Sequence, residues 1–136
     1  MIMAESNVLM LGIQAMDAEH RELSRLLDEF QDLVENDGAI ERIRQVVQDA
    51  IRCGNAHFEH EEQMADKAAY PKMDEEKLNH RNLRLQFTTL AGDMLNFRSR
   101  DPVTLRHLAE MRQLLEEHIA GPDKNLAEYL KANGHK

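Results

Sequence analysis

Apolar residues recur every three or four positions along four long stretches of this chain, a spacing typical of amphipathic α-helices. Helix stop or start signals separate the stretches at positions 36–38, 70–71, 101–102 and 121–122. We therefore expect helices over about 17–36, 40–67, 73–97 and 102–120, followed by a short helical segment near residue 130. Long amphipathic helices joined by short connections pack as antiparallel bundles. The predicted fold is all-α, an antiparallel four-helix bundle with a short C-terminal helix, in one domain over residues 1–136.

Composition narrows the class of protein. The formal net charge of -8 opposes contact with phosphate backbones, so we expect no nucleic-acid partner. Cys53 is the single cysteine, which excludes an internal disulfide and a cysteine-based zinc site and fits a reducing cytoplasm. No stretch is long and apolar enough to span a membrane, and the first residues do not read as a signal peptide. We therefore expect a cytoplasmic protein with no membrane association.

Each of the four apolar stripes also contains a histidine, and some contain a carboxylate, at positions that face the core. On the third helix the spacing runs through Glu76 and His80 without a break. On the other helices the same spacing turns inward His20, His57, Glu61 and His118. Burial of a charged group costs several kcal/mol of hydration unless a partner offsets it. The cluster must therefore be either a hydrogen-bonded polar network or a metal site.

A metal site is the better reading of this pattern. Side chains four residues apart on a helix lie about 5–6 Å apart at Cβ, so His57 with Glu61, and Glu76 with His80, can each converge on one ion. Imidazole and carboxylate donors without thiolate suit iron, manganese or zinc. The donors exceed the needs of one tetrahedral ion. Because carboxylates can bridge, we expect two ions that share Glu61 and Asp123.

The sequence resembles the hemerythrin family in its single-domain bacterial form, over almost the whole chain and in the same order. The pieces that carry the resemblance are LGIQAMDAEH, HFEHEEQM, AYPKMDEEKLNH and HIAGPD. Ferritin-like di-iron bundles are the competing family, but they use Glu-x-x-His pairs, and this chain has none. The resemblance implies two iron ions joined by an oxo or hydroxo bridge. It assigns His20 and His57 to one iron, His80 and His118 to the other, and Glu61 and Asp123 to both.

Position 76 departs from the family pattern, which usually has a histidine four residues before the one that matches His80. A shifted register, with His80 at the earlier position and Arg84 at the later one, would need an insertion and an arginine at a ligand site, so we reject it. Glu76 either binds the second iron directly or accepts a hydrogen bond beside it. An anionic oxygen donor would favour the ferric state and faster oxidation. The family's usual tryptophan is also missing.

The resemblance implies binding of O2, or of a related diatomic such as nitric oxide, for storage, delivery or sensing. A sensory role would need a separate signalling partner, and a redox role would need a separate redox partner. A di-iron oxidase or peroxidase is the alternative that Glu76 favours, and a metal-free or zinc-filled bundle is a third. We do not expect His60, His107, His135 or Cys53 to be ligands. We read Met64, Met73, Met94 and Met111 as packing residues, and Phe58, Leu83 and Ile119 as neighbours that keep water from the ligands.

Overall fold

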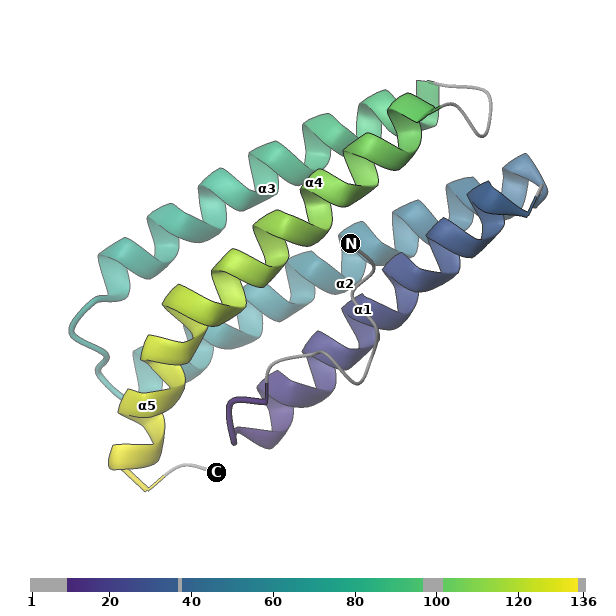
Figure 1. Ribbon diagram of the computed structural model, residues 1–136. Helices are drawn as coiled ribbons and strands as arrows, with labels where there is room; N and C mark the ends of the chain where they lie inside the picture. Colours follow the sequence, from purple (N-terminus) through teal and green to yellow (C-terminus); the bar gives the residue numbers. More distant parts are fainter. Residues whose placement is uncertain (1–9, 37, 97–101, 135–136) are drawn as a thin grey trace.

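The computed structural model describes residues 10–36, 38–96 and 102–134, and these form helices joined by short connections (Figure 1). Consecutive helices lie side by side, and the first also packs against the fourth. The elements in chain order are α1 (Gln14–Glu35), α2 (Ile40–Lys67), α3 (Met73–Asn96), α4 (Pro102–His118), the π-helical turn η2 (Ile119–Asp123) and α5 (Lys124–Ala132). The described residues include no strand, so the predicted all-α bundle is confirmed.

The start of α1 lies three residues before the predicted one because Asp17 has a role inside the helix. Its buried carboxylate accepts hydrogen bonds from the backbone N–H groups of Leu11, at 2.8 Å, and Gly12, at 3.1 Å. Gly12 has φ +86°, a conformation that a glycine adopts without a steric cost. Asp17 therefore fixes the chain as it enters α1, and the helix begins at Gln14.

The predicted stop at residues 70–71 ends α2 in a tight turn. Ala69 adopts φ 53° there, and the N–H of Tyr70 donates to the carbonyl of Ala65 at 2.9 Å. The hydroxyl of Tyr129, on α5, donates to the carbonyl of Ala68 at 2.8 Å. The C-terminal helix is therefore tied to the turn that reverses the chain between α2 and α3.

The predicted stop at Gly121-Pro122 is wrong, because the chain continues through these residues as the turn η2. Proline has no N–H and its ring clashes with the carbonyl four residues earlier in a regular α-helix. A π-helical turn takes one more residue between bonded groups and is found often at functional sites. Here it lets α4 run into α5 with Pro122 inside. The predicted cap at Asp101 lies outside the described residues.

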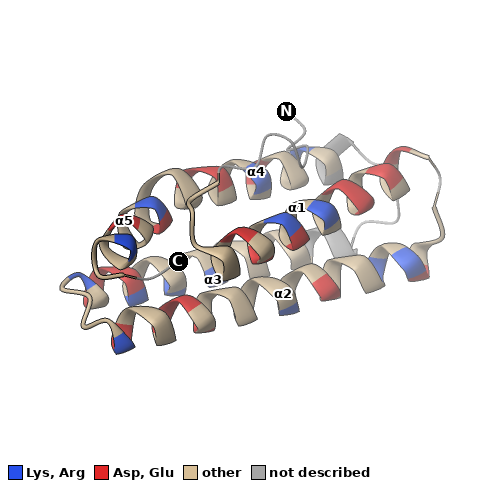
Figure 2. Ribbon diagram, turned by 90° about the horizontal axis from the view of Figure 1, so that it is seen from below, with Lys and Arg blue, Asp and Glu red and all other residues tan. Residues whose placement is uncertain are grey.

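Apolar side chains from every helix fill the interior, as the stripes predict. Met64, Met73 and Met111 pack in or against this core, whereas the side chain of Met94 lies outside the described residues. Acidic and basic positions are interspersed along the helices (Figure 2). Within the described part of the chain, no helix has the length and apolar character that crossing a membrane requires.

Candidate metal centre

The seven side chains predicted as metal ligands lie together in the interior. Their donor atoms form two groups, each with its atoms within 4.8 Å of one another. One group joins α1 to α2, and the other draws on α2, α3 and α4. Glu61 and Asp123 belong to both groups. The first group adds His20 and His57, and the second adds Glu76, His80 and His118.

In the first group, called here the α1–α2 half-site, two imidazoles face the same point. The Nε2 atoms of His20 and His57 lie 3.1 Å apart. The Nε2 of His20 is 2.9 Å from Oδ2 of Asp123, and the Nε2 of His57 is 3.3 Å from Oε1 of Glu61. All four side chains are fully buried.

In the second group, called here the α3–α4 half-site, Glu76 completes the ring of donors. The Nε2 of His80 lies 3.0 Å from oxygens of both Glu61 and Glu76. The Nε2 of His118 lies 2.8 Å from Oδ1 of Asp123. Glu76 is only 3% exposed, so its carboxylate belongs to the interior cluster and not to the surface.

The turn η2 explains how Asp123 joins His118. Residues three or four apart face the same side of an α-helix, but residues five apart do not. The π-helical turn absorbs the additional residue and brings the two side chains into contact. The sequence indicated that a turn must direct Asp123 inward, and the structure identifies that turn.

Polar side chains that the sequence did not single out hold the outer nitrogens of three imidazoles. The Nδ1–H of His57 donates to Glu19 at 3.0 Å, and that of His80 donates to Glu62 at 2.9 Å. The Nδ1–H of His118 donates to Asn79 at 2.7 Å. Such contacts fix the tautomer of a metal-binding histidine and its orientation. No sequence signal identifies them, because each partner lies on a neighbouring helix.

These contacts also determine which imidazole nitrogen presents a lone pair to the interior. An imidazole that donates from Nδ1 to a carboxylate keeps a lone pair on Nε2. In both half-sites that Nε2 faces carboxylate oxygens. Lone pairs opposed to anionic oxygens repel unless a cation, either a metal ion or an added proton, lies between them. The geometry therefore favours bound positive charge at the centre of each group.

The pKa values follow the same electrostatics. Burial lowers the pKa of His80, but the contacts with Glu61 and Glu76 raise it to about 10. Burial also lowers the pKa of His118, but contacts with Asp123 and Glu61 raise it to about 9. Burial raises the pKa of Asp123, whereas its contacts with Glu61 and the surrounding histidines hold it well below its usual value. Protons on the imidazoles thus compensate the carboxylates when no metal does.

A model of the hemerythrin HHE cation binding domain matches residues 11–130. The chain belongs to the hemerythrin family. No curated protein and no solved structure gives a significant match to it. The family assignment covers all seven clustered side chains, and it agrees with the resemblance drawn from the sequence.

The clustered residues of this hemerythrin-family chain fit a pair of cations. Oε2 of Glu61 is buried without a hydrogen-bond partner, as is Nδ1 of His20. Three buried carboxylates, from Glu61, Glu76 and Asp123, converge on the same space. Buried carboxylates of this kind are strongly destabilising without a positive partner, which bound metal ions would supply in place of the imidazole protons. Metal binding is therefore the chemistry that this donor set serves.

Aromatic and aliphatic side chains enclose the cluster. Phe58 is 1% exposed, and its ring stacks on His80 with 4.6 Å between centroids. Leu83 and Ile119 are also buried, and their place beside the ligands stays a prediction. The polar centre is therefore shielded from bulk water on several sides.

The residues that we did not expect to be ligands stay outside both groups. His60 is exposed, and its Nδ1 contacts Glu19, so it lies one contact away from His57. Cys53 is half-buried, and burial raises the pKa of its thiol. His107 belongs to neither donor group, and His135 lies outside the described residues.

Proposed function

We propose that this hemerythrin-family protein binds two iron ions and takes up O2, or a related diatomic such as nitric oxide, at that centre. The observation that carries the proposal is the pair of buried donor groups that share Glu61 and Asp123. Manganese and zinc accept the same ligand types. Iron is favoured because the donors are imidazoles and carboxylates alone. In a chain of this family, such a set suits a redox-active pair of iron ions.

The two half-sites would have different roles in binding the small ligand. Two iron ions held there would supply one electron each and a coordination position for a small ligand. In the α1–α2 half-site, His20, His57 and the two shared carboxylates offer four protein donors. In the α3–α4 half-site, Glu76 raises the number of protein donors to five, so fewer coordination positions would remain for an added ligand. We therefore assign the diatomic to the α1–α2 half-site.

The surrounding side chains would protect the bound ligand. Phe58 packs on His80 and His118, and Ile119 follows His118 in η2; both are 1% exposed and would exclude water from the centre. Exclusion of water prevents hydrolysis and proton leakage at reactive sites. Glu19 and Glu62 keep the imidazoles of His57 and His80 aimed at the centre. The chain would thus place the metal ligands, leave a coordination position free in the α1–α2 half-site, and keep water away from the centre.

The test is to load the protein with ferrous iron without oxygen and measure the iron bound per chain. Oxygen is then added while the visible spectrum is recorded. Two irons per chain and a new charge-transfer band that disappears under vacuum support the proposal. A protein that takes up no iron, or one that retains only zinc under the same conditions, contradicts it.

A di-iron oxidase or peroxidase is the second candidate, and Glu76 is the observation that favours it. Its carboxylate lies 3.0 Å from Nε2 of His80, at a position where an anionic donor would stabilise ferric iron. We expect Glu76→His to slow oxidation of the reduced protein and to lengthen the life of the oxygenated form. An unchanged oxidation rate would remove Glu76 from the ligand set and this candidate with it.

We also propose a cytoplasmic setting and a separate redox partner. A single half-buried cysteine suits a reducing compartment. A redox partner would return iron to the ferrous state after its oxidation by O2 or in the oxidase alternative, since the described residues hold no further redox centre. A pull-down from reduced lysate followed by an electron-transfer assay would identify that partner.

A further inference from the structure

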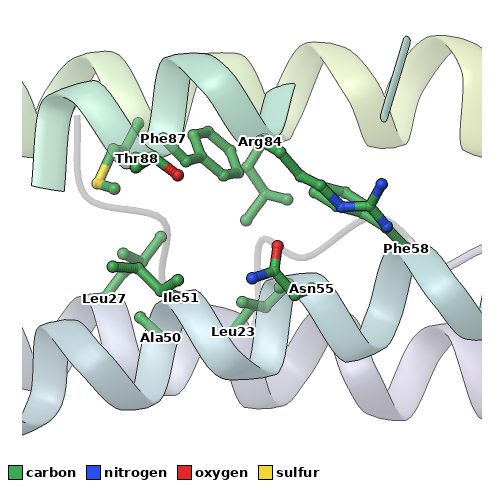
Figure 3. Close-up of a pocket in the computed structure, with 12 residues that line it drawn as sticks. Leu23, Leu27, Ala50, Ile51, Asn55, Phe58, Arg84, Phe87 and Thr88 are labelled. Carbon is green, nitrogen blue, oxygen red and sulfur yellow. The ribbon is translucent and has the colours of Figure 1, made fainter. Parts of the chain in front are cut away.

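An apolar cavity of about 30 Å³, measured as room for the centre of a water-sized sphere, lies beside the metal centre. All four long helices contribute to its wall (Figure 3). The apolar part of that wall includes Leu23, Leu27, Ile51, Phe87, Met111 and Leu115. The wall also includes the polar side chains of Asn55 and Thr88, but most of the lining surface is apolar, so the space suits small apolar molecules better than water.

Phe58 is the wall that the cavity shares with the metal centre. Its side chain lines the cavity, while its ring stacks on His80 and meets His118 edge-on at 5.6 Å between centroids. One aromatic ring therefore separates a molecule in the cavity from two of the clustered imidazoles.

Arg84 lies at the outer end of the same ring. Its guanidinium carbon is 5.5 Å from the centroid of Phe58, and Figure 3 shows its side chain running along that ring at one end of the cavity. Arg84 is the one charged residue among those that line the cavity. Its side chain is 39% exposed, and it shares the solvent side of the cavity with the exposed residues Asn55 and Thr88.

A second contact ties Arg84 to the metal centre. Its Nη2 lies 3.5 Å from Oε2 of Glu62, and this same oxygen accepts the hydrogen bond from Nδ1 of His80. Partly exposed cation–π and ion-pair contacts are individually weak, so thermal motion can break and remake them. Arg84 can therefore leave the cavity mouth without disturbing the packed core.

We propose that Arg84 is a gate that controls the passage of small apolar molecules between solvent and the cavity beside the metal centre. Its contacts with Phe58 and Glu62 hold the gate closed. Movement of Arg84 opens the path and, through Glu62, changes the support of His80. The identity of the admitted molecule as O2 or nitric oxide rests on the proposed function, whereas the gate itself does not.

Xenon tests the gate without iron chemistry, because it is apolar and binds dry cavities. The protein is loaded with zinc, which is diamagnetic, and xenon exchange is followed through the methyl signals of Leu23, Leu27 and Met111. We expect xenon to shift these signals in the wild type. In Arg84→Ala we expect exchange about two- to tenfold faster, as loss of two weak contacts implies.

Three variants make the test specific. Arg81→Ala removes the same charge from the exposed side of α3 and should exchange like the wild type. Glu62→Gln weakens only one of the two contacts and should give an intermediate rate. Gly54→Ala places a methyl group in the cavity wall, where its Cβ would meet Leu23 at 3.8 Å, and should weaken xenon binding.

An exchange rate in Arg84→Ala equal to that of the wild type would overturn the gate, as would the absence of any xenon shift in the wild type. Stopped-flow association of O2 with the iron-loaded protein gives a second readout, and Arg84→Ala should accelerate it. If xenon exchange depends on Arg84 but the iron protein takes up no diatomic, the gate stands and the proposed function fails. The reverse result leaves the proposed function intact and removes the gate.

Discussion

The two half-sites of the cluster share their central carboxylates but differ in how many donors surround them. The α1–α2 half-site has His20 and His57 beside Glu61 and Asp123, and the α3–α4 half-site has Glu76, His80 and His118 beside the same pair. Their outer support differs too. His57, His80 and His118 each donate from Nδ1 to a polar side chain, whereas Nδ1 of His20 has no hydrogen-bond partner.

The α3–α4 half-site therefore offers more protein donors to a metal ion than the α1–α2 half-site does. A fully surrounded ion holds its place, and a less surrounded ion offers a position to an added ligand. If two ions bind as proposed, both would depend on the shared carboxylates, and each would depend separately on its own histidines. Substitutions at these positions therefore test whether the two half-sites differ in metal binding.

The largest expected effect follows substitution of a shared carboxylate. Asp123→Asn keeps the side-chain volume but removes an anionic donor from both half-sites, so we expect both metal ions to be lost. Affinity should fall by more than about 100-fold, beyond the loss known for residues that only support a ligand. Metal content after gel filtration, measured by atomic emission, checks this result. Asp66→Asn, at an exposed position on α2, is the matched control.

Substitution of one histidine should separate the half-sites. His57→Ala leaves the α1–α2 half-site with three donors, and we expect the protein to retain about one ion per chain. His80→Ala leaves the α3–α4 half-site with four donors, so its ion should bind more weakly but remain at saturating metal. Titration with metal followed by mass spectrometry of the intact protein distinguishes the two. Equal losses of metal from the two variants would contradict the inference that the half-site with more donors holds its ion more tightly.

The outer carboxylates should matter less than the ligands. Glu62→Gln and Glu19→Gln each replace an anionic acceptor of an imidazole N–H with a neutral one, and we expect metal affinity to fall about 10-fold. The loss should affect the ion beside His80 in the first variant and the ion beside His57 in the second. Competition with a chromophoric chelator measures both affinities, and exposed Glu59→Gln serves as the control.

The smallest effect concerns the pH dependence of the metal-free protein. The pKa of His118 rises to about 9 and that of His80 to about 10, from an unfolded value near 6.5. A histidine that binds its proton more tightly when folded stabilises the protein fully below that unfolded pKa. The contribution is lost as pH rises through the folded pKa. We expect the melting temperature of metal-free protein to fall between about pH 7 and 10, with a shallower fall in His80→Gln.

Much of the fold and the cluster could be predicted because helix periodicity fixes the direction of each side chain. His20, Glu76 and His80 were expected to face inward from the spacing alone, and all three are buried. The hydrogen bonds from His80 to Glu62 and from His118 to Asn79 could not be predicted in this way. They join different helices, and the rotation of each helix about its axis is decided by packing.

The sequence by itself determined an all-helical chain with a histidine on each long helix and the family that such a pattern indicates. It did so because inward positions on a helix repeat every three or four residues, whatever the neighbouring helices are. Only the tertiary structure decided that a π-helical turn carries Asp123 to His118, and that Arg84 lies across Phe58 at the cavity mouth. These contacts join residues on different helices or across a π-helical turn, and their geometry exists only once the helices are packed.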